Sequence, residues 1–153
     1  MGFTYSIGFK TDDVVQGAAL FVQRLVTPYV GFEVSAEGFQ RIMTADGEVD
    51  GSGVIGLSVL LFPTGSHNEG FNWYLRGGVF TPLFFEGMDN EQALRERGRP
   101  VASFWYGGGV QWRSDCGILS MSLEGVWSED MLFSLYNPME QTFLIRWHTG
   151  IHW

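Results

Sequence analysis

The chain ends with the stretch FLIRWHTGIHW, residues 143–153, in which apolar or lipid-tolerant residues alternate with a more polar set. This period of two is that of a β-strand with one apolar face and one polar face. The stretch is longer than the average soluble strand of about 5–6 residues and suits the roughly 9–11 residues of a transmembrane β-strand. It therefore predicts a strand that faces lipid. Its apolar face carries Phe143, Ile145, Trp147, Thr149, Ile151 and Trp153.

The composition indicates a single all-β domain over residues 1–153. Aromatic residues make up 16% of the chain and glycine contributes 21 residues, while charged residues reach only 17%, below the roughly 25% of soluble domains. The mean hydropathy is +0.04, and no run approaches the about 18 apolar residues of a transmembrane helix, so only a barrel could span a membrane. A net charge of −8 and a single lysine, Lys10, argue against nucleic acid as a partner.

Eight strand-like segments are expected along the chain. The second is ambiguous, because Ala18–Val22 is apolar on both sides, and an amphipathic helix capped by Thr11 or Asp12 is the alternative there. The segments are Phe3–Lys10, Val14–Arg24, a strand that follows Pro28, Ile55–Leu61, Trp73–Val79, Ala102–Arg113, Leu119–Glu124 and Phe143–Trp153.

The connections between these segments alternate in length, with Thr11–Asp13 the one exception. The pattern is typical of outer-membrane barrels, in which one rim carries short turns and the other long loops. We therefore predict an eight-stranded antiparallel up-and-down transmembrane β-barrel. The short connections are Leu25–Pro28, Pro63–Gly70 and Ser114–Gly117, and the long ones are Met43–Gly53, Glu86–Pro100 and Ser128–Met139.

The polar faces of the segments carry charges of both signs. Buried ions are tolerated when they are paired, so we expect a packed polar interior plugged by salt bridges. The expected lumen residues are Glu33, Glu37, Arg76, Glu124, Arg146 and His148.

Aromatic residues fall at the ends of the segments, where two interfacial girdles would lie. Those at turn ends are Tyr29, Trp73, Trp112 and Trp153, and those at loop ends are Phe84, Phe85 and Trp127. The soluble alternative is a ligand-binding barrel of the lipocalin type, which has the same period with its faces inverted. Three features favour the membrane barrel: a polar face rich in glycine and serine, the near absence of lysine, and the aromatic terminal strand.

At the level of pattern, the whole chain resembles the small eight-stranded outer-membrane proteins. These include the adhesin and invasion-related barrels of OmpX-like architecture, the OmpA-type transmembrane domain and the lipid A deacylases. The resemblance rests on Thr27–Phe32, on the glycine-rich Tyr106–Val110 and on Phe143–Trp153. It implies an architecture and an outer-membrane location, not an activity.

One segment resembles the lipid A 3-O-deacylases more specifically. That family places a His-x-Ser pair near the end of a late strand and a glutamate about a dozen residues later. Ser128 and Glu140 match the serine and the glutamate, but Val126 stands where the histidine would be. A serine hydroxyl needs an adjacent base to act as a nucleophile, so the match describes an inactive relative and no catalytic residue is assigned.

The remaining polar residues suggest no cofactor or metal. His148 and His152 lie four residues apart on the inward face, but no third ligand stands at a fixed spacing. The expected role is therefore structural or surface-interacting through the outer loops. A lipid A deacylase-like hydrolase and a narrow channel for small apolar solutes are the alternatives. The expected partners are outer-membrane lipids, lipopolysaccharide and a protein bound by the loops.

The expected location is the outer membrane of a Gram-negative-type bacterium. Met1-Gly2 runs directly into strand-like sequence, so we expect that a start codon has replaced a native signal peptide.

Overall fold

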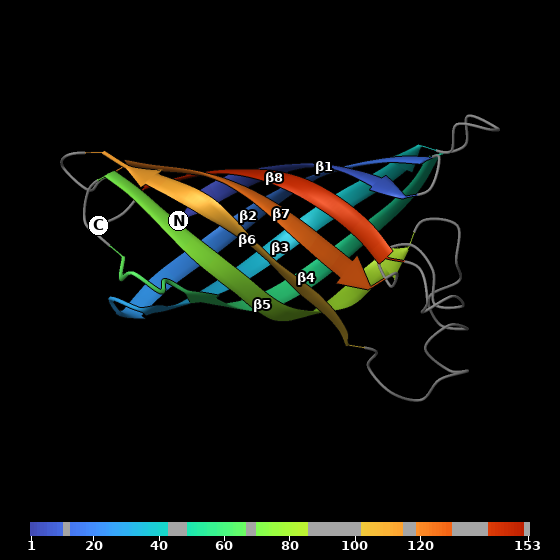
Figure 1. Ribbon diagram of the computed structural model, residues 1–153. Helices are drawn as coiled ribbons and strands as arrows, with labels where there is room; N and C mark the ends of the chain where they lie inside the picture. Colours follow the sequence, from blue (N-terminus) through green and yellow to red (C-terminus); the bar gives the residue numbers. More distant parts are fainter. Residues whose placement is uncertain are drawn as a thin grey trace.

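The structure, a computed structural model, describes residues 1–10, 13–42, 49–66, 70–85, 102–114, 119–129 and 141–151. These residues form a closed antiparallel barrel in which neighbouring strands are consecutive from β1 to β8 and β8 pairs back with β1 (Figure 1). The strands are β1 (Gly2–Lys10), β2 (Asp13–Thr27), β3 (Val30–Ile42), β4 (Val49–Leu61), β5 (Gly70–Phe85), β6 (Ser103–Arg113), β7 (Leu119–Glu129) and β8 (Gln141–Ile151).

Both described chain ends lie at the same end of the barrel, as an even strand number requires (Figure 1). We call this the turn end, because it also holds the connections from β2 to β3, from β4 to β5 and from β6 to β7. The opposite end is the loop end. At the turn end, Pro28 and Tyr29 form the turn after β2, and the Thr27 hydroxyl accepts hydrogen bonds from the backbone amides of Tyr29 and Val30. In the part of the chain that the structure describes, no helix is long and apolar enough to cross a membrane.

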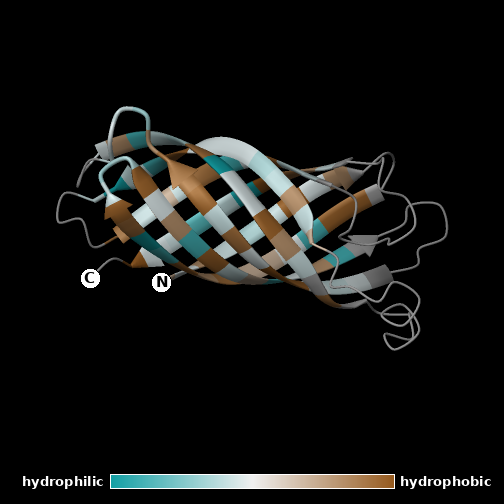
Figure 2. Cartoon of the chain, turned by 90° about the horizontal axis from the view of Figure 1, so that it is seen from below, coloured by the Kyte–Doolittle hydropathy of each residue, from teal (hydrophilic) through white to brown (hydrophobic). Residues whose placement is uncertain are grey.

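Buried and exposed side chains alternate along the strands, and Figure 2 shows hydrophobic and hydrophilic residues following one another along them. The outer wall is apolar: exposed large hydrophobic side chains occur on all eight strands, from Phe3 on β1 to Ile151 on β8. The interior holds the buried glutamate, arginine and histidine side chains, together with many serines. The faces are therefore apolar outward and polar inward, the reverse of a lipocalin-type barrel.

The interior also contains two apolar layers, where the sequence predicted a polar interior. One is a ring at the loop end with a member on every strand except β1: Val15, Phe39, Val54, Phe80, Trp105, Val126 and Leu144, all at most 2% exposed. The other lies at the turn end and comprises Leu60, Phe62 and Tyr74, with Leu25 packed against it. The paired side chains of Glu33, Arg76, Glu124 and Arg146 lie between these layers.

One prediction of local structure is confirmed against its alternative, and another is wrong. The segment Val14–Arg24 is the predicted strand, which excludes the helical alternative, and it is apolar on both sides because Val15 and Phe21 fill the interior while Leu20 and Val22 face outward. The predicted connection Met43–Gly53 is too long, since β4 begins at Val49 and pairs with β3 from its first residue.

Three further strand ends lie beyond the predicted ones. β2 continues to Thr27 and β5 to Phe85, and β7 runs to Glu129, so Ser128 lies in a strand instead of opening a loop. Most of the predicted connection Leu25–Pro28 therefore belongs to β2, and Ser128, the first residue of the predicted connection Ser128–Met139, pairs with Thr142 of β8.

Candidate functional site

The buried carboxylate of Glu124, in the middle of β7, is the centre of the interior network. Its Oε2 accepts hydrogen bonds from the Tyr74 hydroxyl at 2.8 Å and from Arg76 Nε at 2.9 Å. Its Oε1 lies 2.7 Å from His148 Nε2 and 3.6 Å from Arg146 Nη1. Strands β5, β7 and β8 therefore meet at this single carboxylate, which is 2% exposed.

Arg76 extends the network across the barrel to β3 and β4. Its Nη1 and Nη2 donate to the two carboxylate oxygens of Glu33 at 2.7 and 3.0 Å. This two-point pairing suits a planar guanidinium, and Nη1 also donates to Ser58 Oγ at 3.0 Å. The Arg76 side chain thus connects Glu33 to Glu124 and fixes the distance between opposite walls.

Arg146 forms a second arm of the network, closer to the loop end. Its Nη2 donates to Glu37 Oε1 at 2.6 Å, and its guanidinium carbon lies 5.2 Å from the centre of the Trp105 ring. The Trp105 indole N–H in turn donates to Ser58 Oγ at 2.9 Å. Trp105 therefore connects the polar network to the apolar ring through a cation–π contact and a hydrogen bond.

Two inward glycines leave the space that Trp105 occupies. A Cβ added at Gly56 or at Gly78 would overlap the Trp105 indole. The inward faces of β4 and β5 consequently need glycine at these positions, because the ring lies directly against their backbones.

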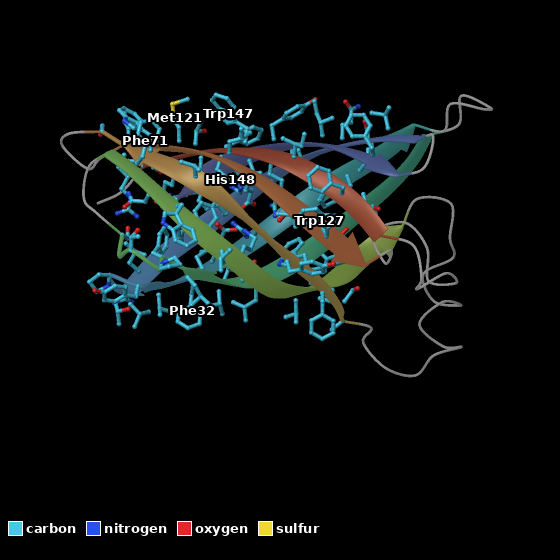
Figure 3. The ribbon with its side chains drawn as sticks, viewed as in Figure 1. Phe32, Phe71, Met121, Trp127, Trp147 and His148 are labelled. Carbon is cyan, nitrogen blue, oxygen red and sulfur yellow. The ribbon has the colours of Figure 1, made fainter. Side chains whose placement is uncertain are left out.

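His148 completes the network toward β1. Its Nε2 faces Glu124, and its Nδ1 lies 2.8 Å from the Thr4 hydroxyl. The ring also meets Phe21 edge to face, with the centroids 5.4 Å apart. Figure 3 shows His148 inside the barrel, whereas Phe71, Met121 and Trp147 point away from it. Both nitrogens of a buried imidazole are thereby hydrogen-bonded.

The structure brings together the predicted lumen residues Glu33, Arg76, Glu124, Arg146 and His148 in one connected network. Sequence analysis placed Glu37 on the inward face but did not identify it as the partner of Arg146. It also missed the contributions of Tyr74, Trp105 and Ser58. These residues occupy inward-facing positions in the alternation of their strands. That alternation is the one feature of the sequence from which they could have been predicted.

Little space remains around the network. The cavity that adjoins Glu33, Arg76, Tyr74 and His148 has a volume of about 10 Å³, roughly the space of a single water molecule. The described interior is thus closed by paired charges in the middle and by the apolar ring at the loop end.

Ser128 is not arranged for nucleophilic catalysis within the described residues. Ser128 faces the interior, is 0% exposed, and donates to the Thr142 carbonyl at 3.4 Å. His148, the one histidine among the described residues, pairs with Ser122 on β7, whereas Ser128 pairs with Thr142. The six residue steps from Ser122 to Ser128 span roughly 20 Å along the strand, too far for proton transfer. Glu140 lies outside the described residues.

The predicted interfacial aromatics lie mostly on the outer wall. Tyr29, Trp73 and Trp127 are about half exposed, and Trp112 is half-buried. At the loop end Trp127 stacks on Tyr106, with ring centroids 6.1 Å apart and planes 16° apart. Trp153 and the side chains of Phe84 and Phe85 lie outside the described residues, so the girdles stay a prediction.

No group of three or more histidine, cysteine, aspartate or glutamate side chains within the described ranges is arranged to hold a metal ion.

Comparison with known proteins gives a likeness of fold. No family model matches the chain, and no curated protein sequence matches it. A solved structure described as the crystal structure of the outer membrane enzyme PagL superimposes with a TM-score of 0.51 at 9% sequence identity. The match covers 97% of this chain and 98% of that one. It confirms the predicted eight-stranded antiparallel barrel and the resemblance to small outer-membrane barrels, and the chain has an outer-membrane barrel fold.

Proposed function

We propose that this protein is a closed barrel of the outer membrane of a Gram-negative-type bacterium, with a structural or surface-interaction role exerted through its loop end. The observation that carries the proposal is the distribution of side chains. Large hydrophobic residues such as Phe32, Trp73 and Leu123 are exposed on the wall, while Glu124 and Arg146 are buried inside.

A wall with so much exposed apolar surface requires an apolar surrounding. Exposed apolar patches on soluble monomers rarely exceed a few hundred Å², and here the exposed hydrophobic side chains cover every strand. Lipid satisfies such a wall, and the pairing of β8 with β1 closes the sheet, which removes the free edge that hydrocarbon could not satisfy. Both features support a membrane location and argue against the lipocalin-type alternative.

The proposal includes two aromatic girdles at the membrane interfaces. Tyr29 and Trp73 lie near the turn end of the wall and Trp127 near the loop end. Ring systems with one polar group are favoured at the headgroup level. Quenching of tryptophan fluorescence by lipids brominated at different depths should be strongest for shallow bromines in a variant that retains Trp127 alone. Strongest quenching by bromines at the bilayer centre would contradict the girdle.

The closed interior supports a non-conducting role over a channel. A solute would have to pass the apolar ring and then separate the Arg76–Glu33 and Arg146–Glu37 pairs, each buried to at least 95%. Separating a buried ion pair costs several kcal/mol, about 3–5 by mutational experience. This cost would make passage through the described interior slow.

The orientation of Ser128 supports a non-enzymatic role. A lipid substrate would lie against the outer wall, while the Ser128 hydroxyl and the Val126 side chain both face the interior and are 0% exposed. No described imidazole reaches this serine. The likeness to an outer membrane enzyme is therefore one of fold, and the geometry favours an inactive or unrelated role.

The proposal is tested by refolding and conductance. The refolded protein should be β-rich in detergent, should migrate differently on a gel before and after boiling, and should fractionate with the outer membrane when expressed behind a signal peptide. In planar bilayers it should give no steady conductance under conditions in which a general porin conducts. A detergent-free monodisperse monomer would refute the membrane location, and large stable openings would refute the closed interior.

A further inference from the structure

The outer wall carries a groove of about 500 Å³ near the loop end, over β1 to β4. Its floor consists of main chain, because Ala18, Gly38 and Gly51 contribute almost no side chain. Ala18 pairs with Gly38, and Gly51 pairs with the adjacent Gln40, so the small residues form one continuous depression. A Cβ added at Gly38 would meet nothing within 4 Å, so the depression is open.

The groove differs from the rest of the apolar wall in its polar lining. Gln16 Nε2 donates to Gln40 Oε1 at 3.3 Å across β2 and β3. Whichever amide donates, this bond leaves one amide NH₂ and one amide carbonyl without a described partner. Unused polar groups next to hydrocarbon are costly unless a ligand satisfies them.

The depth of these groups matches that of a lipid linkage. Gln16 lies three residues from the start of β2 and Gln40 two residues from the end of β3, both at the loop end. Three residues correspond to roughly 10 Å along a strand. A groove that begins there would receive an acyl chain, while the amides would face the region where the chain joins its head group.

We propose that this groove binds an acyl chain of a lipid in the loop-side leaflet whose linkage offers both a hydrogen-bond donor and an acceptor, as the amide-linked hydroxyacyl chains of lipopolysaccharide do. The inference rests on the proposed membrane location. An ester-linked phospholipid chain offers acceptors alone at this point, so it would leave the free amide carbonyl unsatisfied. The free donor and acceptor in the wall therefore favour lipopolysaccharide over an ester-linked phospholipid.

The experiment measures lipid retention by the folded barrel. Protein refolded in mixed micelles of lipid A and phosphatidylethanolamine is analysed by native mass spectrometry for lipid bound per barrel. Wild type should retain lipid A over phosphatidylethanolamine by about fivefold, as expected for one or two net hydrogen bonds. Gly38→Leu should abolish that preference by filling the groove. The matched control is Gly77→Leu, which adds the same side chain at another exposed wall glycine with nothing within 4 Å and should behave as wild type.

The amide side chains are tested separately. Gln16→Leu combined with Gln40→Leu keeps a groove for hydrocarbon but removes the donor and the acceptor, so both lipids should be retained equally. Each variant is first shown to fold by its shift on an unboiled gel. Equal retention of the two lipids by wild type, or equal lipid A retention by wild type and Gly38→Leu, would refute the site. Because these outcomes come from barrels that have folded into micelles, they leave the membrane assignment standing.

Discussion

Replacing Arg76 with methionine should be among the most destabilising single changes in the barrel interior. Arg76 donates four hydrogen bonds, two to Glu33, one to Glu124 and one to Ser58, at 2.7–3.0 Å. Glu124 keeps His148 as a partner at 2.7 Å after the substitution. Glu33 keeps no described ion-pair partner, and its carboxylate is 2% exposed.

The size of the expected loss in unfolding free energy follows from the Glu33 carboxylate, which stays buried without its partner. Removing one member of a buried pair costs about 3–5 kcal/mol, because the remaining charge stays desolvated. Lowering the pH from about 8 to about 5 makes protonation of that carboxylate easier and so relieves the buried charge. The difference in unfolding free energy between wild type and Arg76→Met should therefore shrink as the pH falls.

The assay is reversible urea unfolding of the refolded protein in lipid vesicles, followed by the fluorescence of its six tryptophans. The control is the double variant Glu33→Leu with Arg76→Met, which removes both charges and should cost less than Arg76→Met alone. A loss below about 1 kcal/mol for the single variant, the range of an exposed ion pair, would refute the argument. A double variant that costs the sum of the two single variants would do the same.

Three further outcomes are expected. Gly78→Ala should destabilise the barrel strongly, because a Cβ at Gly78 overlaps Trp105. Gly77→Ala should leave the urea midpoint nearly unchanged, because a Cβ at Gly77 meets nothing within 4 Å. Equal effects of the two substitutions would show that Trp105 lies elsewhere. Expression of the protein should leave lipid A intact by mass spectrometry, and loss of an acyl chain that Ser128→Ala prevents would overturn the non-enzymatic reading. Leu123→Arg, on the outer wall, should cost about 2–4 kcal/mol in vesicles if it lies at the bilayer midplane, and a near-neutral effect would argue that this position contacts water.

Apart from β2, the strands could be predicted because each of them repeats a period of two, with its apolar residues facing outward and its polar residues inward. The facing of Glu33, Arg76 and Glu124 follows from that period alone. Their pairing does not, because it depends on how far each strand is staggered against the next around the closed barrel, a quantity that no single segment encodes. Arg146 illustrates the limit: its 2.6 Å partner Glu37 is 109 residues away in sequence, and the sequence offered Glu33 and Glu124 as equally good partners.

The apolar layers were missed for a different reason. Val15, Val54 and Leu144 stand at inward positions, where the sequence pattern leads one to expect polar groups. Such residues blur the alternation of their own strands, and β2 shows this most clearly, since Val15 and Phe21 inside make the segment apolar on both faces. Only the assembled barrel shows that seven strands each contribute one such residue to a common ring.

Parity alone argues against the chemistry that the serine motif suggested. Ser128 lies four residues after Glu124 on the same strand, so both side chains must point to the same face. A glutamate that is paired with Arg76 has to face the interior, and Ser128 therefore faces it too, as its 0% exposure shows. A lipid acyl ester outside the wall cannot meet a hydroxyl on the inner face of the same strand without opening the barrel. The same parity places Gln16, Gln40 and Gly38 on the outside, where a lipid can reach them.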